Sequence, residues 1–195
     1  MLYVLAFIFL FSIGGLTGVM QGVISIDIQL HDTAFIVGHF HYVMFGGTGF
    51  AMFAAFHYWM PKMFGKMYNR KLAKIAFWFI FIGFNFLYFP MLVMGWLGMP
   101  RRYYDYLPQF HPYHLISTIG SWILIIGLIL MFYNLFKSLK SGPIVTEKNI
   151  WGGETLEWQI DSPPIHENFT EIPVIEERPY VYKDNEPPVE KEETV

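Results

Sequence analysis

Residues 33–60 read TAFIVGHFHYVMFGGTGFAMFAAFHYWM, and this stretch decides the fold. It exceeds the roughly 20 mostly apolar residues that an α-helix needs to cross a bilayer, and it contains no Asp, Glu, Lys or Arg. Its run of glycines, Gly46, Gly47 and Gly49, is typical of close packing between membrane helices. His39 and His41 lie near its start. The stretch therefore predicts a transmembrane helix that carries His39 and His41 inside the membrane.

Three further stretches have the same apolar character, at roughly residues 2–24, 73–99 and 113–136. The whole chain is 54% hydrophobic and only 15% charged, which is too apolar for an ordinary soluble domain. The first stretch is too long for a signal peptide and lacks a basic start and a cleavage site, so we expect it to be a mature helix. The predicted fold is all-α, a polytopic membrane bundle of four transmembrane helices joined by polar loops at residues 25–32, 61–74 and 100–112.

Charge divides the chain into two parts. Residues 1–140 contain nine Lys and Arg against three Asp, a net charge of +6, whereas residues 141–195 contain four Lys and Arg against thirteen Asp and Glu, a net charge of -9. We expect the first part to be the transmembrane part. The second is predicted to be an extended, partly disordered acidic tail in which residues 151–158 can dock on a partner and residues 176–195 are largely disordered.

Loop charges predict the orientation in the membrane. The loop at residues 61–74 carries five basic residues and no acidic one, and Lys137 and Lys140 follow the fourth stretch. Because cytoplasmic loops carry an excess of Lys and Arg, both termini are expected on the cytoplasmic or matrix side. The other two loops then face outward.

The pair His39 and His41 points to redox cofactors. An α-helix turns about 100° per residue, so His39 and His41 lie about 200° apart around the axis at nearly the same depth. They cannot chelate one ion, because helical ligands on a shared face are three or four residues apart. The spacing suits two flat cofactors on either side of the helix, with Phe40 between them. The alternative is two neutral histidines hydrogen-bonded to neighbouring helices, but axial haem ligation is favoured, since haem is a common cargo of helical bundles.

A polar cluster precedes this helix. Asp32 or Thr33 can simply cap the helix, with His31 at the interface. The alternative is a divalent metal site that uses the His31 imidazole and the Asp32 carboxylate, which suits magnesium or manganese. The remaining ligands would come from another segment or chain. No cysteine is present, so thiolate ligands and disulfides are excluded.

Arg101 and Arg102 lie on the predicted outer side, where the loop-charge rule does not explain them. They can extend from the interface towards water, as arginines commonly do. They can also pair with the two propionates of a haem, because guanidinium binds carboxylates bidentately and stays charged when partly buried.

Several motifs together resemble subunit I of the haem-copper cytochrome c oxidases. The central one is His31-Asp32-Thr33 followed by His39-Phe40-His41-Tyr42. The others, in the same order as in that family, are IGGLTG at residues 13–18, GMPRRY at 98–103, LEW at 156–158 and SPP at 162–164. The tyrosine that is common after the HDT triplet is Ala34 here. The resemblance covers residues 5 to 170.

The resemblance implies a role for each matching residue. His39 would be the axial ligand of a high-spin haem at the oxygen-reducing centre, His41 an axial ligand of a low-spin haem, and Phe40 would lie between the two haems, which are expected to be haem A. The remaining roles would be magnesium or manganese ligation by His31 and Asp32, propionate binding by Arg101 and Arg102, and proton exit at Asp27.

The resemblance also implies missing parts. The chain looks like helices nine to twelve plus the tail, so we expect either the C-terminal piece of a divided subunit I or a truncated sequence. The ligands of copper B and the second ligand of the low-spin haem would lie in the N-terminal half of subunit I. Further expected partners are subunit II with copper A, subunit III, cytochrome c and membrane lipid, but no nucleic acid. The expected location is the inner membrane of a bacterium or a mitochondrion.

The function implied is part of the catalytic subunit of a terminal oxidase, which reduces O₂ to water with electrons from cytochrome c and pumps protons. It would be active only with the missing helices. A quinol oxidase of the same superfamily is the nearest alternative, although the HDT triplet and Tyr42 favour cytochrome c as the donor. The other alternative is a non-catalytic membrane protein or transporter in which the histidines serve packing or proton relay.

Overall fold

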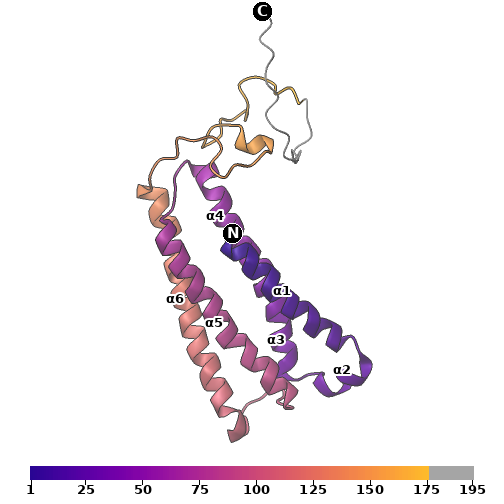
Figure 1. Ribbon diagram of the computed structural model, residues 1–195. Helices are drawn as coiled ribbons and strands as arrows, with labels where there is room; N and C mark the ends of the chain where they lie inside the picture. Colours follow the sequence, from indigo (N-terminus) through magenta and orange to yellow (C-terminus); the bar gives the residue numbers. More distant parts are fainter. Residues whose placement is uncertain (176–195) are drawn as a thin grey trace, which may run out of the picture.

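The structure is a computed structural model that describes residues 1–175, and the predicted disorder of residues 176–195 lies outside the described residues (Figure 1). The described elements are all helical, apart from two isolated β-bridges. In chain order they are α1 (Leu2–Gln21), α2 (Ile24–Leu30), α3 (Ala34–Val43), the π-helix η1 (Met44–Gly49), α4 (Phe50–Phe64), α5 (Arg70–Trp96), the 3₁₀-helix η2 (Pro108–Phe110), α6 (His111–Ser141) and the 3₁₀-helix η3 (Leu156–Trp158).

The chain is a multi-pass membrane protein. Three helical stretches are long and apolar enough to cross a bilayer: α1, α5 and the continuous run of η2 and α6. The stretch at residues 33–60 is not one regular helix, because α3, η1 and α4 follow one another without an intervening residue over residues 34–64. Each of these three pieces is shorter than a bilayer requires. The count of four transmembrane helices therefore stays a prediction.

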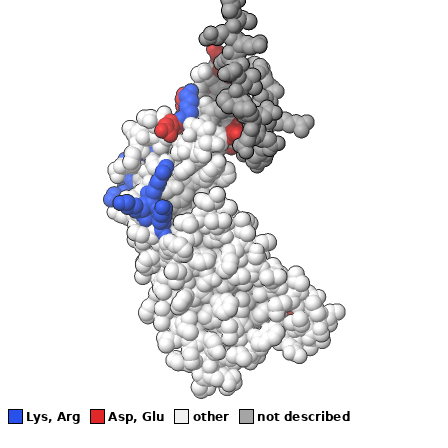
Figure 2. Space-filling model, in the orientation of Figure 1, with Lys and Arg blue, Asp and Glu red and all other residues white. Residues whose placement is uncertain are grey.

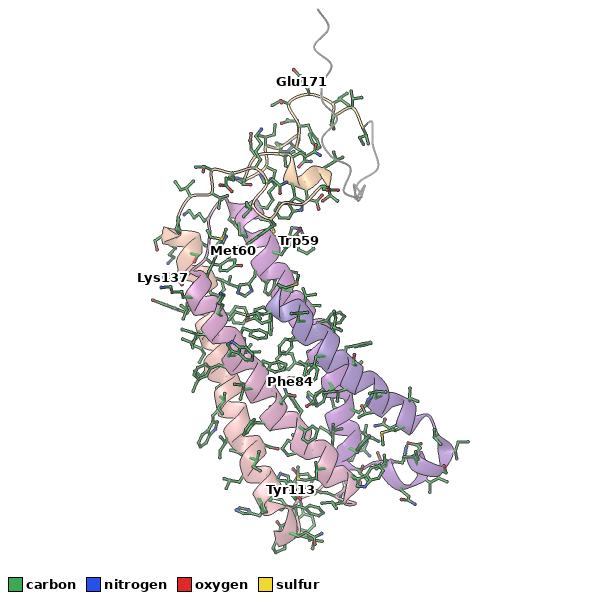
Figure 3. All side chains as sticks on the ribbon, viewed as in Figure 1. Trp59, Met60, Phe84, Tyr113, Lys137 and Glu171 are labelled. Atoms are coloured by element: carbon green, nitrogen blue, oxygen red, sulfur yellow. The ribbon has the colours of Figure 1, made fainter. Side chains whose placement is uncertain are left out.

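The helices form two arms that meet along part of their length. In Figure 1, α5 and α6 lie side by side as one arm, and α1 lies along α3 and α4 in the other. Packing of α3 on α5 joins the arms. Large side chains fill the junction, and Figure 3 shows Phe84 of α5 reaching into it. Leu10, Phe50, Ile80 and Phe84 are fully buried there, so the junction is the core of the bundle.

Glycines permit the closest helix contacts. A Cβ atom at Gly46 would lie 2.9 Å from Cβ of Leu10, and one at Gly47 would lie 3.0 Å from the Phe11 ring. Both neighbours belong to α1, so the predicted packing role of these two glycines is confirmed. Gly49 differs, because its nearest neighbour is Phe45 of its own helical run.

The predicted polar loop at residues 25–32 is wrong in part, because most of it forms α2. Ile24 and Ile28, four residues apart, are exposed together on one side of this short helix, whereas Leu30 is buried. The backbone N–H of His31 donates to the carbonyl of Asp27 at 2.7 Å and closes the last turn. The spacing of Ile24 and Ile28 is typical of a helix, whereas the number of polar residues in 25–32 indicated a loop.

The described part of the tail docks on the bundle rather than extending freely. Its first residues pair with the α4–α5 connection, where Met67 N–H donates to Pro143 O and Val145 N–H donates to Gly65 O, each at 2.9 Å. Further along, Trp158 is only 1% exposed. Residues 151–158, which were expected to dock on a partner, instead cover the end of α4 of the same chain.

Lys62 at the end of α4 holds this docked segment. Its side chain is 4% exposed, and its ammonium group donates to the carbonyl oxygens of Lys148, at 3.1 Å, and of Ile160. The same group lies 5.7 Å from the centroid of the Trp158 ring, a cation–π distance. The indole N–H of Trp151 adds a hydrogen bond of 2.9 Å to the carbonyl of Tyr58.

Basic side chains gather at the end of the bundle that the tail covers, which we call the basic end. Figure 2 shows Lys and Arg clustered there, next to acidic residues of the tail, while the rest of the helical surface in this view is almost uncharged. The basic residues at this end come from the end of α4, the α4–α5 connection, the first turns of α5 and the last turns of α6: the buried Lys62, and Lys66, Arg70, Lys71, Lys74, Lys137 and Lys140.

Replacing Gly120 by alanine tests the packing of α5 against α6. A Cβ atom there would lie 2.4 Å from the backbone nitrogen of Leu87, so the two helices must separate. We expect a loss of about 1–3 kcal/mol in the free energy of unfolding, the usual cost of overpacking. Gly15→Ala is the matched control, because nothing lies within 4 Å of its Cβ. Thermal unfolding of the detergent-solubilised chain, followed by circular dichroism, measures both; equal stability of the two variants would contradict the packing.

Candidate haem-ligating site

His39 is held by α1. Its Nδ1 lies 3.0 Å from the carbonyl oxygen of Gly14 and 3.0 Å from the hydroxyl of Thr17. A carbonyl oxygen can only accept, so Nδ1 carries the proton and donates it to Gly14. The absence of a side chain at Gly18 makes room for the ring, since a Cβ there would lie 2.9 Å from Cε1 of His39. Nε2 is left with its lone pair.

His41 has the same tautomer but different neighbours. Its Nδ1 donates to the carbonyl oxygen of Val37, one turn earlier in α3, at 2.8 Å. Its ring lies against Tyr88 of α5, with centroids 4.1 Å apart and planes inclined by 17°. Across residues 1–175, no hydrogen bond reaches Nε2 of either His39 or His41.

This arrangement fits two separate metal-ligating imidazoles. In metal sites, a ligating histidine commonly donates its second ring N–H to a backbone carbonyl or a carboxylate, which fixes the tautomer and the ring direction. Both histidines have that carbonyl partner, and one contacts α1 whereas the other contacts α5. The residues present therefore fit a haem on each side of α3. Phe40, whose side chain is partly exposed, stacks on His41 at 4.5 Å.

At the end of the bundle away from the basic end, the segments before α3 and after α5 are joined. Ala34 N–H donates to Met99 O at 2.8 Å, and Arg101 N–H donates to Asp32 O at 2.9 Å. The Thr33 hydroxyl oxygen accepts from Phe35 N–H at 3.3 Å, so the predicted helix cap is Thr33. Asp32 instead adopts a left-handed backbone conformation with φ of 58°.

The candidate metal ligands lie close together without completing a site. Nδ1 of His31 is 3.8 Å from a carboxylate oxygen of Asp27, and Nε2 is 4.0 Å from one of Asp32. The other oxygen of Asp32 pairs with the Arg101 guanidinium at 2.8 Å. Within residues 1–175, no group of three His, Cys, Asp or Glu residues is arranged to hold a metal ion. Any ion here would need ligands from outside the described residues.

The two arginines differ in their surroundings. Arg101 is 29% exposed, and its Nε is buried without a hydrogen-bond partner among the described residues. A buried donor without an acceptor is unfavourable. A carboxylate such as a haem propionate could supply the acceptor. Arg102 is exposed, so it is free to bind an acceptor at the surface.

Sequence reasoning missed the residues that hold the two imidazoles. Gly14 and Thr17 belong to the IGGLTG motif of α1, which was noticed only as part of a resemblance. Tyr88 lies in α5, four residues after the buried Phe84, so helical spacing alone would have placed the two on one face. Which residue they face, however, depends on how α5 packs on α3.

Comparison with known proteins shows the family of this chain. The family model for cytochrome c and quinol oxidase polypeptide I matches residues 1–123. Cytochrome c oxidase subunit 1 of Synechocystis sp. is 45% identical over 195 residues, which are all of this chain and 35% of that protein. Quinol oxidase subunit 1 of Bacillus subtilis is 43% identical over 179 residues, 90% of this chain and 28% of that protein.

Solved structures include a similar chain in a heme-copper terminal oxidase dimer studied by cryo-EM. Its TM-score is 0.65 at 30% identity, and the match covers 73% of this chain and 27% of that chain. The chain thus spans about a third of the length of the curated relatives it matches.

Asp32→Asn tests the ion pair that joins the two segments. Asparagine tolerates the left-handed backbone at this position, so the change removes the charge without adding backbone strain. Because Asp32 is half exposed, we expect a loss of only about 0.5–1 kcal/mol in unfolding free energy at low salt, shrinking in 1 M salt. Asp105→Asn is the control, as Asp105 makes only a local hydrogen bond to Tyr106 N–H. Equal salt dependence in both variants would contradict a stabilising pair.

Proposed function

Because this chain belongs to the cytochrome c and quinol oxidase polypeptide I family, we propose that it forms part of the catalytic subunit of a terminal respiratory oxidase. The complete enzyme reduces O₂ to water with electrons from cytochrome c and couples this reaction to proton pumping. This chain supplies one wall of each haem site, and the activity requires the rest of the subunit.

The observation that carries the proposal is the state of the two imidazoles. His39 and His41 each donate Nδ1–H to a backbone carbonyl and keep Nε2 available. His57 of α4 has the same pattern, with Nδ1 2.7 Å from the carbonyl oxygen of Phe53 and a buried Nε2 that has no hydrogen-bond partner among the described residues, so an open Nε2 does not by itself mark an iron ligand. His39 and His41 differ from it because they are two residues apart on α3 and contact different helices, α1 and α5, as ligands of two separate haems must.

Each matching residue receives a role in this proposal. His39 ligates the high-spin haem at the oxygen-reducing centre, and His41 ligates the low-spin haem. When bound, the haems transfer electrons and reduce oxygen, while this chain binds and orients them. Gly14 and Thr17 hold the His39 ring, and Phe40 lies between the two haem sites.

Residues at the end away from the basic end complete the haem surroundings. Arg101, with its unpartnered Nε, and the exposed Arg102 bind haem propionates. His31 and Asp32 contribute ligands to a magnesium or manganese ion whose other ligands belong to a partner. Asp27, whose side chain is 40% exposed, takes part in proton exit beside them.

The length of the relatives, of which this chain spans about a third, supports an assembly with further parts of the subunit. We propose that the chain corresponds to the C-terminal helices of subunit I, with residues 34–64 as a fourth span and the basic end on the cytoplasmic or matrix side of the inner membrane. The N-terminal half then provides the copper B ligands and the second ligand of the low-spin haem. Subunit II with copper A, subunit III, cytochrome c and lipid are the further partners, and the haems are of the A type.

A quinol oxidase is the second candidate, because a quinol oxidase subunit is 43% identical to this chain. The intact His31-Asp32-Thr33 triplet and Tyr42 favour cytochrome c as the donor. A neighbouring gene that encodes a copper-A protein would support cytochrome c, and its absence would favour quinol.

Substituting each histidine in turn tests the ligand assignment. The chain is co-expressed with a candidate N-terminal half, and reduced-minus-oxidised spectra are recorded. We expect His39→Ala to lose the high-spin haem signal and His41→Ala to lose the low-spin signal, because each removes one axial ligand. His111→Ala, which changes an exposed histidine, should keep both. Retention of both haems in His39→Ala and His41→Ala would show that the assignment is wrong.

The purified chain alone tests whether the remaining helices are needed. Because it provides at most one axial ligand to each haem, we expect it to bind no haem stably and to consume no oxygen. Haem titration followed by absorbance, together with an oxygen electrode, measures both properties, and the co-expressed assembly is the positive control. Oxygen consumption by the isolated chain would refute the proposed dependence.

A further inference from the structure

The His41 ring lies between two aromatic rings. Phe40 stacks on it with centroids 4.5 Å apart and planes inclined by 29°, and Tyr88 with centroids 4.1 Å apart and planes inclined by 17°. Two rings so close and so nearly parallel to the imidazole would collide if they shared one face. They therefore cover opposite faces, and the imidazole is restrained from both sides.

Tyr88 is partly buried and packs against the core of the bundle. Phe84, one turn earlier in α5, is fully buried and lies 4.9 Å from Tyr88, centroid to centroid. The Phe84 ring in turn makes a T-shaped contact with Tyr42 of α3, with centroids 5.1 Å apart. The Tyr42 hydroxyl donates to the side-chain carbonyl of Asn85 at 2.9 Å. One face of α5 thus fixes where the Tyr88 ring stands relative to α3.

The two histidines are restrained in different ways. His39 is tied by Nδ1 to Gly14 and Thr17 of a second helix, and it makes no ring stack within the described part of the chain. The hydrogen bond of His41 reaches only Val37 of its own helix. This bond fixes the tautomer, but it does not fix the position of the ring relative to the other helices. Among the described residues, the aromatic ring of another helix that contacts His41 is Tyr88.

We propose that Tyr88 is a positioning residue that sets the plane of the His41 imidazole, and through it the electronic properties of the haem that His41 ligates. This inference rests on the proposed function, which makes His41 that ligand. Neighbours that orient a ligating histidine tune the iron it holds. The plane of an axial imidazole decides which iron d orbitals its π electrons meet, so rotating it alters the g values of the ferric haem and its midpoint potential.

The test uses the assembled oxidase and reads the low-spin haem by electron paramagnetic resonance and by redox titration. Tyr88→Leu removes the stack, and we expect the largest g value to move or broaden and the midpoint potential to shift. Tyr88→Phe keeps the ring and should match the wild type. Phe89→Leu is the matched control, since Phe89 is exposed on the same helix and should change neither quantity. The high-spin haem should be unaffected in all three variants.

The outcomes separate the inference from the proposed function. Unchanged g values and potential in Tyr88→Leu would overturn the inference, as would an equal change in Tyr88→Phe or Phe89→Leu. If Tyr88→Leu does not assemble, Tyr88→Met, which fills a similar space with a flexible chain, is judged by the same criteria. A low-spin haem that survives His41→Ala would instead overturn the ligand assignment.

Discussion

The contact between α1 and α3 at Gly14 positions the rest of the site. A Cβ atom at Gly14 would lie 2.9 Å from the backbone nitrogen of Val43, so the two helices touch backbone to backbone. This closeness lets the Gly14 carbonyl reach the His39 ring. In an apolar environment such a hydrogen bond is hard to replace, because no water competes for either partner. It therefore fixes the rotation of α3 about its axis, and with it the side on which His41 meets α5.

The sequence was sufficient for features that depend on neighbouring residues. Apolar runs indicated α1, α5 and α6, because crossing a bilayer imposes a length and a composition that few other structures share. Thr33 could be recognised as a cap candidate from its place before an apolar helix. The opposed directions expected for His39 and His41 followed from helical geometry alone, since both residues lie on one helix.

Features that depend on distant residues were not predictable in this way. Residues 141–175 look like a polar tail by composition, yet Trp158 is buried. Lys62, almost a hundred residues earlier, holds it there, because the Lys62 ammonium group donates to the carbonyl oxygen of Ile160 and lies over the Trp158 ring. Tyr88 similarly became part of the site only through the packing of α5 on α3. The short helix α2 was missed for a local reason, because its helical pattern spans only seven residues.

The π-helix η1 divides residues 34–64 into two halves with separate tasks. A wider turn needs an extra residue, and each residue corresponds to about 100° of rotation in an α-helix. A helical wheel drawn through the whole stretch therefore assigns the residues of α4 to the wrong face. The register shift lets α3 present its histidines to α1 and α5, while α4 directs Lys62 and Tyr58 to the tail. Removing one residue from Met44–Gly49 would rotate α4 relative to α3 about the helix axis. The number of residues in η1 therefore determines which sides of the molecule the two helices face.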